Sequence, residues 1–327
     1  MNDQASPGLS TFEARVRAGR FVMTAEIAPP VSADAQDLRS KAAPLKGLAD
    51  AVNVTDGAGA RAHMGALAAA AILDRAGIEP ILQIACRDKN RIALQSELMG
   101  AAALGIRNLM LLGGDDPKAG DQPETKAVFD IDSKTLIETA RRLRDDGTLP
   151  TGRKVAGRAA FLIGAADVPL DPPAGWQPAA LHAKVSAGAQ FVQTQFCMDA
   201  AIVRRYVAAL ESAGLTRQLA LLVGVTPLRS AKSARWMKDR LFGTIIPDAL
   251  IARLDEAADP SHEGVRICVE LIEELSTIVL ADFDAETRFR ARAALGSPQE
   301  ALRLLDRLDH EDSDSSASGP GRARRRR

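Results

Sequence analysis

The sequence contains few cysteines, few aromatic residues and no excess of charge of either sign. Its three cysteines form no Cys-x-x-Cys pair among 327 residues, so they indicate neither a disulfide framework nor a structural zinc site. The 42 Lys and Arg residues balance the 42 Asp and Glu residues, so no general field attracts nucleic acid or an acidic membrane. We therefore expect a small-molecule partner and no nucleic-acid partner.

The sequence also lacks long apolar runs and the pattern of a targeting segment. No stretch of about 18 uncharged apolar residues occurs, and Met1 to Ser10 has no basic segment followed by an apolar one. The four histidines show no spacing suited to a metal site or a catalytic triad. These absences predict a cytoplasmic protein with no membrane partner and no metal site.

Short apolar runs alternate with amphipathic helical patterns along most of the chain. The seven runs expected as strands are 21–28, 51–55, 80–85, 108–112, 159–163, 191–194 and 219–224. The main helical patterns between them are 37–48, 63–76, 91–104, 133–145, 177–187 and 198–213. Near-continuous apolar strands between amphipathic helices indicate a parallel sheet that is covered on both faces.

Polar residues follow many of these strands, which favours an α/β fold of the (β/α)8 TIM-barrel type. An open, doubly wound sheet would gather its ligand at one switch point, and it stays the alternative. We expect one catalytic barrel domain over residues 19–308, after an N-terminal extension of residues 1–18. The only candidate for an eighth strand is Thr277 to Ala281, so the C-terminal end of the barrel is irregular. Residues 309–327, an acidic and then arginine-rich tail, are expected to be disordered.

Glu26 lies in the first strand pattern, shortly before two prolines that end the strand. A carboxylate at a barrel mouth, partly shielded by Ile27 and Met23, would have a raised pKa and could act as a general acid. The alternative is an ion pair between Glu26 and a neighbouring Lys or Arg.

Asp115 follows Gly113-Gly114 after the fourth strand pattern. The two glycines would let the backbone approach a planar ligand closely, and Asp115 would then project over that ligand. The alternative is a plain turn with positive φ. Neither the Gly-x-Gly-x-x-Gly fingerprint nor a Walker-type loop is present, so the usual dinucleotide and nucleoside-triphosphate sites lose support.

Gln195 ends the sixth strand pattern and offers a hydrogen-bond donor and an acceptor together. That pair of groups could read the amide-like edge of a heterocycle, or it could satisfy neighbouring backbone. Lys184 lies near the end of a helical pattern, where a Lys usually complements the helix dipole.

Nine segments together resemble the methylenetetrahydrofolate reductase family over roughly residues 20 to 245. The segments are Glu26-x-x-Pro29-Pro30, Val54-Thr55-Asp56, Gln83-Ile84-Ala85-Cys86-Arg87-Asp88, Leu104-Gly105-Ile106-Arg107-Asn108, Gly114-Asp115-x-Pro117, Asp130-x-Asp132, Lys184-x-x-Ala187-Gly188-Ala189, Thr194-Gln195-Phe196-x-x-Asp199 and Gly224-Val225-x-Pro227-Leu228. The Cys-Arg-Asp and Asp-x-Asp-Ser variants resemble reductase-like modules beside or fused to homocysteine methyltransferase domains, which suggests methionine biosynthesis.

The resemblance implies a flavoprotein barrel that reduces 5,10-methylenetetrahydrofolate to 5-methyltetrahydrofolate, with hydride passing from NAD(P)H through FAD. Glu26 would be the general acid, and Asp115 would stabilise the cationic substrate beside the flavin. Gln195 and Phe196 would bind the folate. The residues implied for FAD are Thr55, Gln83, Gly114, Asp115, Asp132 and Lys184. A homo-oligomer is possible.

Three positions depart from the family pattern. Gln83 stands where many members have His, Gly113 stands where they have Arg, and the segment Gly164 to Asp167 lacks the usual aromatic residue. Because those positions help to hold flavin in the family, two alternatives stay open. One is a flavin-free or specialised-pathway folate reductase, and the other is a non-catalytic paralogue that binds folate.

Overall fold

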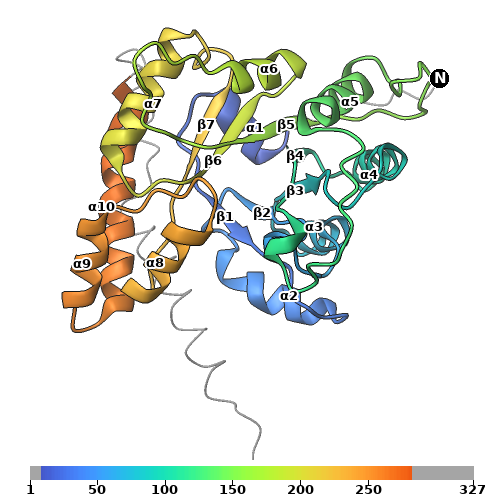
Figure 1. Cartoon of the computed structure of the whole chain (residues 1–327). Coiled ribbons are helices and arrows are strands. Elements are labelled where there is room, and N and C mark those ends of the chain that lie inside the picture. The colour runs from blue at the N-terminus through green and yellow to red at the C-terminus, as the bar shows by residue number, and fades with distance from the viewer. Residues whose placement is uncertain (1–8, 282–327) are drawn as a thin grey trace, which may run out of the picture.

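Seven parallel strands form the curved wall of a barrel, and helices cover its outside (Figure 1). The structure, a computed structural model, describes residues 9–281. The strands are β1 (Thr24–Ile27), β2 (Ala51–Val54), β3 (Pro80–Ala85), β4 (Asn108–Leu112), β5 (Leu162–Asp167), β6 (Phe191–Phe196) and β7 (Ala220–Gly224). Each lies within or overlaps a run predicted as a strand, so that prediction is confirmed.

Helices follow the strands in the alternating order that the sequence indicates. They are α1 (Thr11–Arg17), α2 (Ala35–Ala42), α3 (Ala66–Arg75), α4 (Arg91–Ala103), α5 (Ser133–Asp145), α6 (Ala179–Ala187), α7 (Ala200–Ser212), α8 (Ala231–Arg240), α9 (Asp248–Glu256) and α10 (Pro260–Ala281). Short 3-10 turns are η1 (Ala43–Leu45), η2 (Ala58–Ala60) and η3 (Pro117–Ala119). Figure 1 shows α2 to α5 along one side of the barrel and α7 to α10 along the other.

Strand order distinguishes the barrel from the doubly wound alternative. Each strand pairs in parallel with the next strand in the chain, from β1 through β7. A doubly wound sheet would contain a reversal of this order, and the described sheet has none. The barrel prediction is confirmed.

The candidate eighth strand is wrong, because Thr277–Ala281 forms the last part of α10. Leu271 and Leu275 are buried at helical spacing just before it, and no Gly or Pro interrupts the run that follows. The helix therefore continues through residues that a strand pattern also fits. Between β7 and β1 the described part of the chain contains no strand. The predicted tail, 309–327, lies outside the described residues.

Side chains on the strands alternate between a helix-facing core and the barrel interior. The interior apolar cluster takes one residue from each of six strands: Ala51, Ile81, Met110, Leu162, Phe191 and Leu222. From α1, Phe12 joins this cluster, and its ring meets Phe191 edge to face at a centroid distance of 5.6 Å. Residues predicted as an extension thus include a helix that fills the amino end of the barrel.

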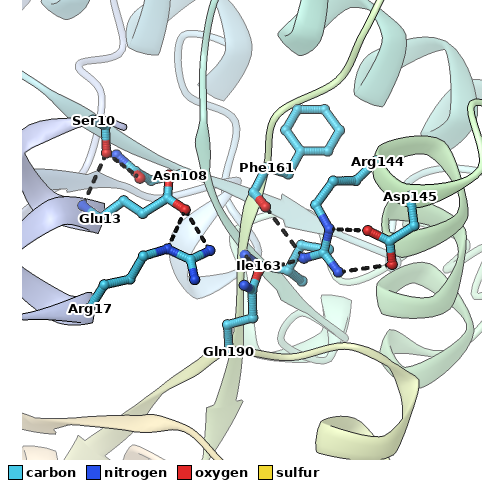
Figure 2. A network of polar contacts seen from close by, with 9 residues as sticks. All are labelled: Ser10, Glu13, Arg17, Asn108, Arg144, Asp145, Phe161, Ile163 and Gln190. Carbon is cyan, nitrogen blue, oxygen red and sulfur yellow. Dashed lines mark hydrogen bonds and ion pairs between the residues drawn. The ribbon is translucent and has the colours of Figure 1, made fainter. Parts of the chain in front are cut away.

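Hydrogen bonds hold α1 at this end of the barrel. The carboxylate of Glu79 accepts bonds from the backbone N–H groups of Thr11 and Phe12, at 3.0 and 3.1 Å. Asn108 donates to Glu79 at 2.8 Å. It also accepts from the hydroxyl of Ser10 at 3.0 Å, as Figure 2 shows. With its amino end closed, the barrel is left with the carboxyl ends of its strands as its mouth, where loops carry function in such folds.

No helix among residues 9–281 is long and apolar enough to cross a membrane.

Candidate active site

Four polar side chains meet inside the barrel, above the interior apolar cluster. Glu26 comes from β1, Asn53 from β2, Gln83 from β3 and Gln193 from β6. Asn53, Gln83 and Gln193 each stand two residues after a member of the interior apolar cluster, and Glu26 stands two residues after Thr24, which lines the cavity described below. Side chains two residues apart on a strand point to the same face of the sheet. Strands far apart in the sequence therefore deliver one carboxyl group and three amides to one place.

The three amides, here called the amide cluster (Asn53, Gln83 and Gln193), all donate to one oxygen of Glu26. The distances to Glu26 Oε2 are 3.0 Å from Asn53 Nδ2, 3.3 Å from Gln193 Nε2 and 3.4 Å from Gln83 Nε2. Asn53 Nδ2 also donates to Gln193 Oε1 at 3.0 Å. These bonds fix the carboxyl group and join opposite sides of the barrel wall.

Burial in the barrel raises the pKa of the Glu26 carboxyl above its usual range. Hydrogen bonds from the amide cluster oppose that rise, and the nearby negative charge of Asp115 adds to it. Glu26 takes part in no ion pair within the described part of the chain, so the ion-pair alternative is wrong. The predicted rise in pKa is confirmed.

A cavity of about 1520 Å³ lies between the edges of β1 and β7 and reaches Glu26. Its lining includes Glu26, Phe196 and the apolar side chains of Val223 and Val225. The side chain of Glu26 is accessible from this cavity although protein surrounds it on the other sides. A ligand in the cavity would thus meet a carboxyl group that is exposed on the cavity side and enclosed by protein on the others.

Asp115 lies at the mouth, after β4, and its side chain is exposed. Its Oδ2 accepts a bond from the backbone N–H of Gly59 at 2.9 Å, which links the loops after β2 and β4. Because its charge acts on Glu26, the two carboxyl groups lie at the same end of the barrel. Asp115 does not line the cavity described above.

The backbone conformation of Gly114 and the side chain of Arg87 next to it both require a glycine at this position. Gly114 has a φ of +98°, and a Cβ there would lie 2.9 Å from the Cβ of Arg87. The guanidinium of Arg87 is buried and binds Asp88 through two hydrogen bonds, at 2.8 and 2.6 Å. Gly113 has open space where a Cβ would stand, so close approach of a flat ligand is possible there instead.

Gln195 uses its amide on the protein backbone. Its Nε2 donates to the carbonyl of Phe242 at 3.1 Å, and its Oε1 accepts from the N–H of Phe196 at 3.0 Å. The interpretation that Gln195 satisfies neighbouring backbone therefore describes this state, and a folate contact would have to replace the bond to Phe242. Phe196 lines the cavity.

The other residues predicted to hold FAD separate into two groups. Gln83 and Gly114 lie at the mouth with Thr55, whose buried hydroxyl has no hydrogen-bond partner among the described residues. Asp132 instead caps α5 through the N–H of Thr135 at 2.8 Å. Lys184 donates to the carbonyl of Ala166 at 2.6 Å. The orphaned hydroxyl and the open face of Gly113 fit a flat, polar cofactor at the mouth.

Sequence reasoning missed Asn53 and Gln193. Asn53 is the one polar residue of β2, and Gln193 stands two residues before Gln195 on the same strand. The signal that could have found them is the two-residue period, which places Gln193 and the interior residue Phe191 on one face. In the part of the chain that the structure describes, no group of three His, Cys, Asp or Glu side chains could hold a metal ion.

A parallel barrel in which three amides hold one carboxyl group toward the carboxyl ends of the strands places the protein in the class of TIM-barrel proteins with an acid–amide site. The chain belongs to the methylenetetrahydrofolate reductase family, whose sequence model matches residues 11–287. The probable methylenetetrahydrofolate reductase (NADPH) of Caenorhabditis elegans is 26% identical over 218 residues, 63% of this chain and 30% of that protein. The 5,10-methylenetetrahydrofolate reductase of Escherichia coli K12 is 27% identical over 229 residues, 67% of this chain and 69% of that protein.

The chain spans about a third of the length of the nematode relative and of a Schizosaccharomyces pombe relative. Among solved structures, it is similar to an uncharacterized protein from Clostridium thermocellum that binds two copies of 5-methyl-5,6,7,8-tetrahydrofolic acid. The TM-score is 0.62 at 12% identity, covering 92% of this chain and all of that one. At this identity the likeness shows a shared fold.

The raised pKa of Glu26 makes folding stability depend on pH. Glu26 binds its proton more tightly in the folded chain, so its contribution to stability is fully present below the ordinary carboxyl pKa of 4.5 and is lost as pH rises through the raised value. We predict that Glu26→Gln raises the melting temperature, and that its advantage over wild type grows as pH rises from 4.5. Each kcal/mol corresponds to roughly 2 °C in a chain of this size.

Melting curves between pH 4.5 and 8 test this, with Glu211→Gln as the control for losing an exposed charge. A gap between wild type and Glu26→Gln that stays constant over this range would contradict the prediction.

Proposed function

We propose that the chain reduces 5,10-methylenetetrahydrofolate to 5-methyltetrahydrofolate, with NAD(P)H as the source of hydride and FAD as its relay. The observation that carries the proposal is Glu26, a carboxyl group with a raised pKa that is held by three amides and lines the cavity between the edges of β1 and β7. Membership of the family, the activities in its relatives' names and the folate bound by the Clostridium thermocellum protein support it.

The reaction needs an acid because a carbon–nitrogen bond must break. The methylene carbon bridges N5 and N10 of the folate, and the electron pair of its bond to N10 leaves with N10. Glu26 supplies the proton that N10 takes up, which leaves an iminium between N5 and the carbon. Hydride then adds to this carbon and produces the methyl group. A carboxyl group whose pKa lies above its usual range keeps its proton to a higher pH and can make the first transfer.

Asp115 contributes electrostatically to the same reaction. The iminium is a cation, and a carboxylate at the mouth stabilises a cation that forms beside it. The same negative charge raises the pKa of Glu26 and so favours the protonated carboxyl group that the transfer to N10 requires. One residue thus favours both the charged intermediate and the acid that creates it.

FAD would accept hydride from NAD(P)H and deliver it to the folate. Thr55, Gln83 and Gly114 are the residues of this chain that would hold it at the mouth, and Thr55 offers an unpaired hydroxyl for a contact. Asp132 and Lys184 stay predicted contacts that would have to share their present partners. Cytoplasmic location, methionine biosynthesis and assembly into homo-oligomers also stay predictions from the sequence.

A flavin-free reductase is the second candidate, because Asp132 and Lys184 already bond to the protein itself. The absorbance spectrum of freshly purified protein distinguishes the two. We expect a yellow protein whose flavin bands bleach when NADH or NADPH is added. Colourless protein that oxidises NADH only when methylenetetrahydrofolate is present would select the flavin-free enzyme, and folate binding without turnover would overturn both.

Glu26→Gln tests the role of the acid. We predict that the variant keeps the reduction of flavin by NADH but loses folate reduction by roughly 10²- to 10⁴-fold, because only the folate step requires a nitrogen to leave. Stopped-flow measurement of the two half-reactions separates these effects, with Glu256→Gln, an exposed glutamate outside the cavity lining, as the matched control. Folate turnover at the wild-type rate would remove Glu26 as the acid.

Gln195→Ala tests the folate contact. We predict a KM for folate that rises by roughly tenfold, the worth of about one hydrogen bond, with flavin content unaltered. Gln36→Ala is the control, because it deletes an exposed glutamine whose side chain bonds only within α2 and does not line the cavity. Folate affinity unchanged in Gln195→Ala would mean that its amide serves only the Phe242 loop.

A further inference from the structure

We infer that the amide cluster, Asn53, Gln83 and Gln193, confines the transferable proton of Glu26 to Oε1, the oxygen that is free to meet a ligand. The three residues are positioning residues for the acid. The use of this proton on folate rests on the proposed function, but its location on Glu26 does not.

The direction of the hydrogen bonds carries the argument. All three amides present N–H groups to Glu26 Oε2, and these groups can only donate. A proton on Oε2 would point at donor hydrogens, whereas a proton on Oε1 meets no such conflict. Oε1 has no hydrogen-bond partner among the described residues, and Glu26 lines the cavity.

Asn53 also decides which way Gln193 points. Its Nδ2 lies 3.0 Å from both Glu26 Oε2 and Gln193 Oε1 and 3.7 Å from the sulfur of Met110, so the two oxygens are the closer acceptors for its two hydrogens. With its oxygen accepting from Asn53, Gln193 must turn its own NH2 group toward Glu26, at 3.3 Å. The bonds form a closed set of three, which excludes the flipped orientation of the Gln193 amide.

The remaining oxygen of Asn53 shows that packing alone did not select this residue. Asn53 is almost completely buried, and its Oδ1 has no hydrogen-bond partner in the described structure. An apolar residue would avoid that unsatisfied oxygen. The position instead keeps an NH2 group that contacts the acid.

Amide groups can orient a protonated Glu26 better than cations can. A Lys or Arg on Oε2 would hold Glu26 ionised, whereas amide donors orient it and lower its pKa only in part. Asp115, from the loop after β4, is the charged group that acts on Glu26, and Lys41 of α2 and Arg229 after β7 line the same cavity. These charges are unchanged in the variants below.

Infrared titration of the full chain without added substrate tests the inference. The difference spectrum between a protein and the same protein carrying Glu26→Gln isolates the C=O stretch of the protonated Glu26 carboxyl. We expect Gln193→Met, which removes a donor at similar length, to move the midpoint of this titration up by roughly one pH unit. Gln36→Met, the same change on the exposed face of α2, should leave the midpoint in place. A midpoint in Gln193→Met that equals or falls below the wild-type value would overturn the inference.

Gln83→Met keeps the inference testable if Gln193→Met does not fold. It removes the longest of the three bonds to Oε2, so a smaller shift in the same direction is expected, and no shift would overturn the inference. If the proposed reduction is correct, the alkaline limb of the folate rate profile moves with the infrared midpoint. An infrared shift without any folate turnover would uphold the proton location and reject the proposed function.

Discussion

The partly desolvated carboxyl group of Glu26, which is open to solvent only on its cavity side, is the constraint on which the rest of the site depends. Taken alone, a carboxylate inside a barrel would be expelled or neutralised, because burial penalises its charge. Here three neutral amide groups donate hydrogen bonds to one oxygen of Glu26, and no cation bonds to it among the described residues. The result is an acid that is held in one orientation and keeps its proton at a higher pH than an exposed glutamate does.

The closed amino end of the barrel makes this arrangement possible. Phe12 and the interior apolar cluster fill the barrel below Glu26, while Glu79 and Asn108 satisfy the polar groups of α1 at the floor. Water therefore reaches the acid only from the cavity and the mouth. The amino end of the barrel thus contributes packing and stability, and the carboxyl end carries the reactive groups, as is usual in TIM barrels.

Several residues that a family resemblance groups together serve different local purposes. Gly114 makes room for the side chain of Arg87, Asp132 caps a helix, and Lys184 binds the carbonyl of Ala166. A motif position can thus be kept for a structural reason as well as for a cofactor.

Alternation of apolar runs and helical patterns was enough to determine a parallel sheet covered by helices and to place Glu26 and Asp115 at strand ends, because both depend on the local period of the chain, whereas strand order decided for the barrel. The same local pattern failed at Thr277–Ala281, where a β-branched run continues α10. Only the tertiary structure decided that Asn53 and Gln193, 140 residues apart, bond to each other and to one carboxyl group. No local pattern reports such contacts, because they arise when distant strands close around a shared interior.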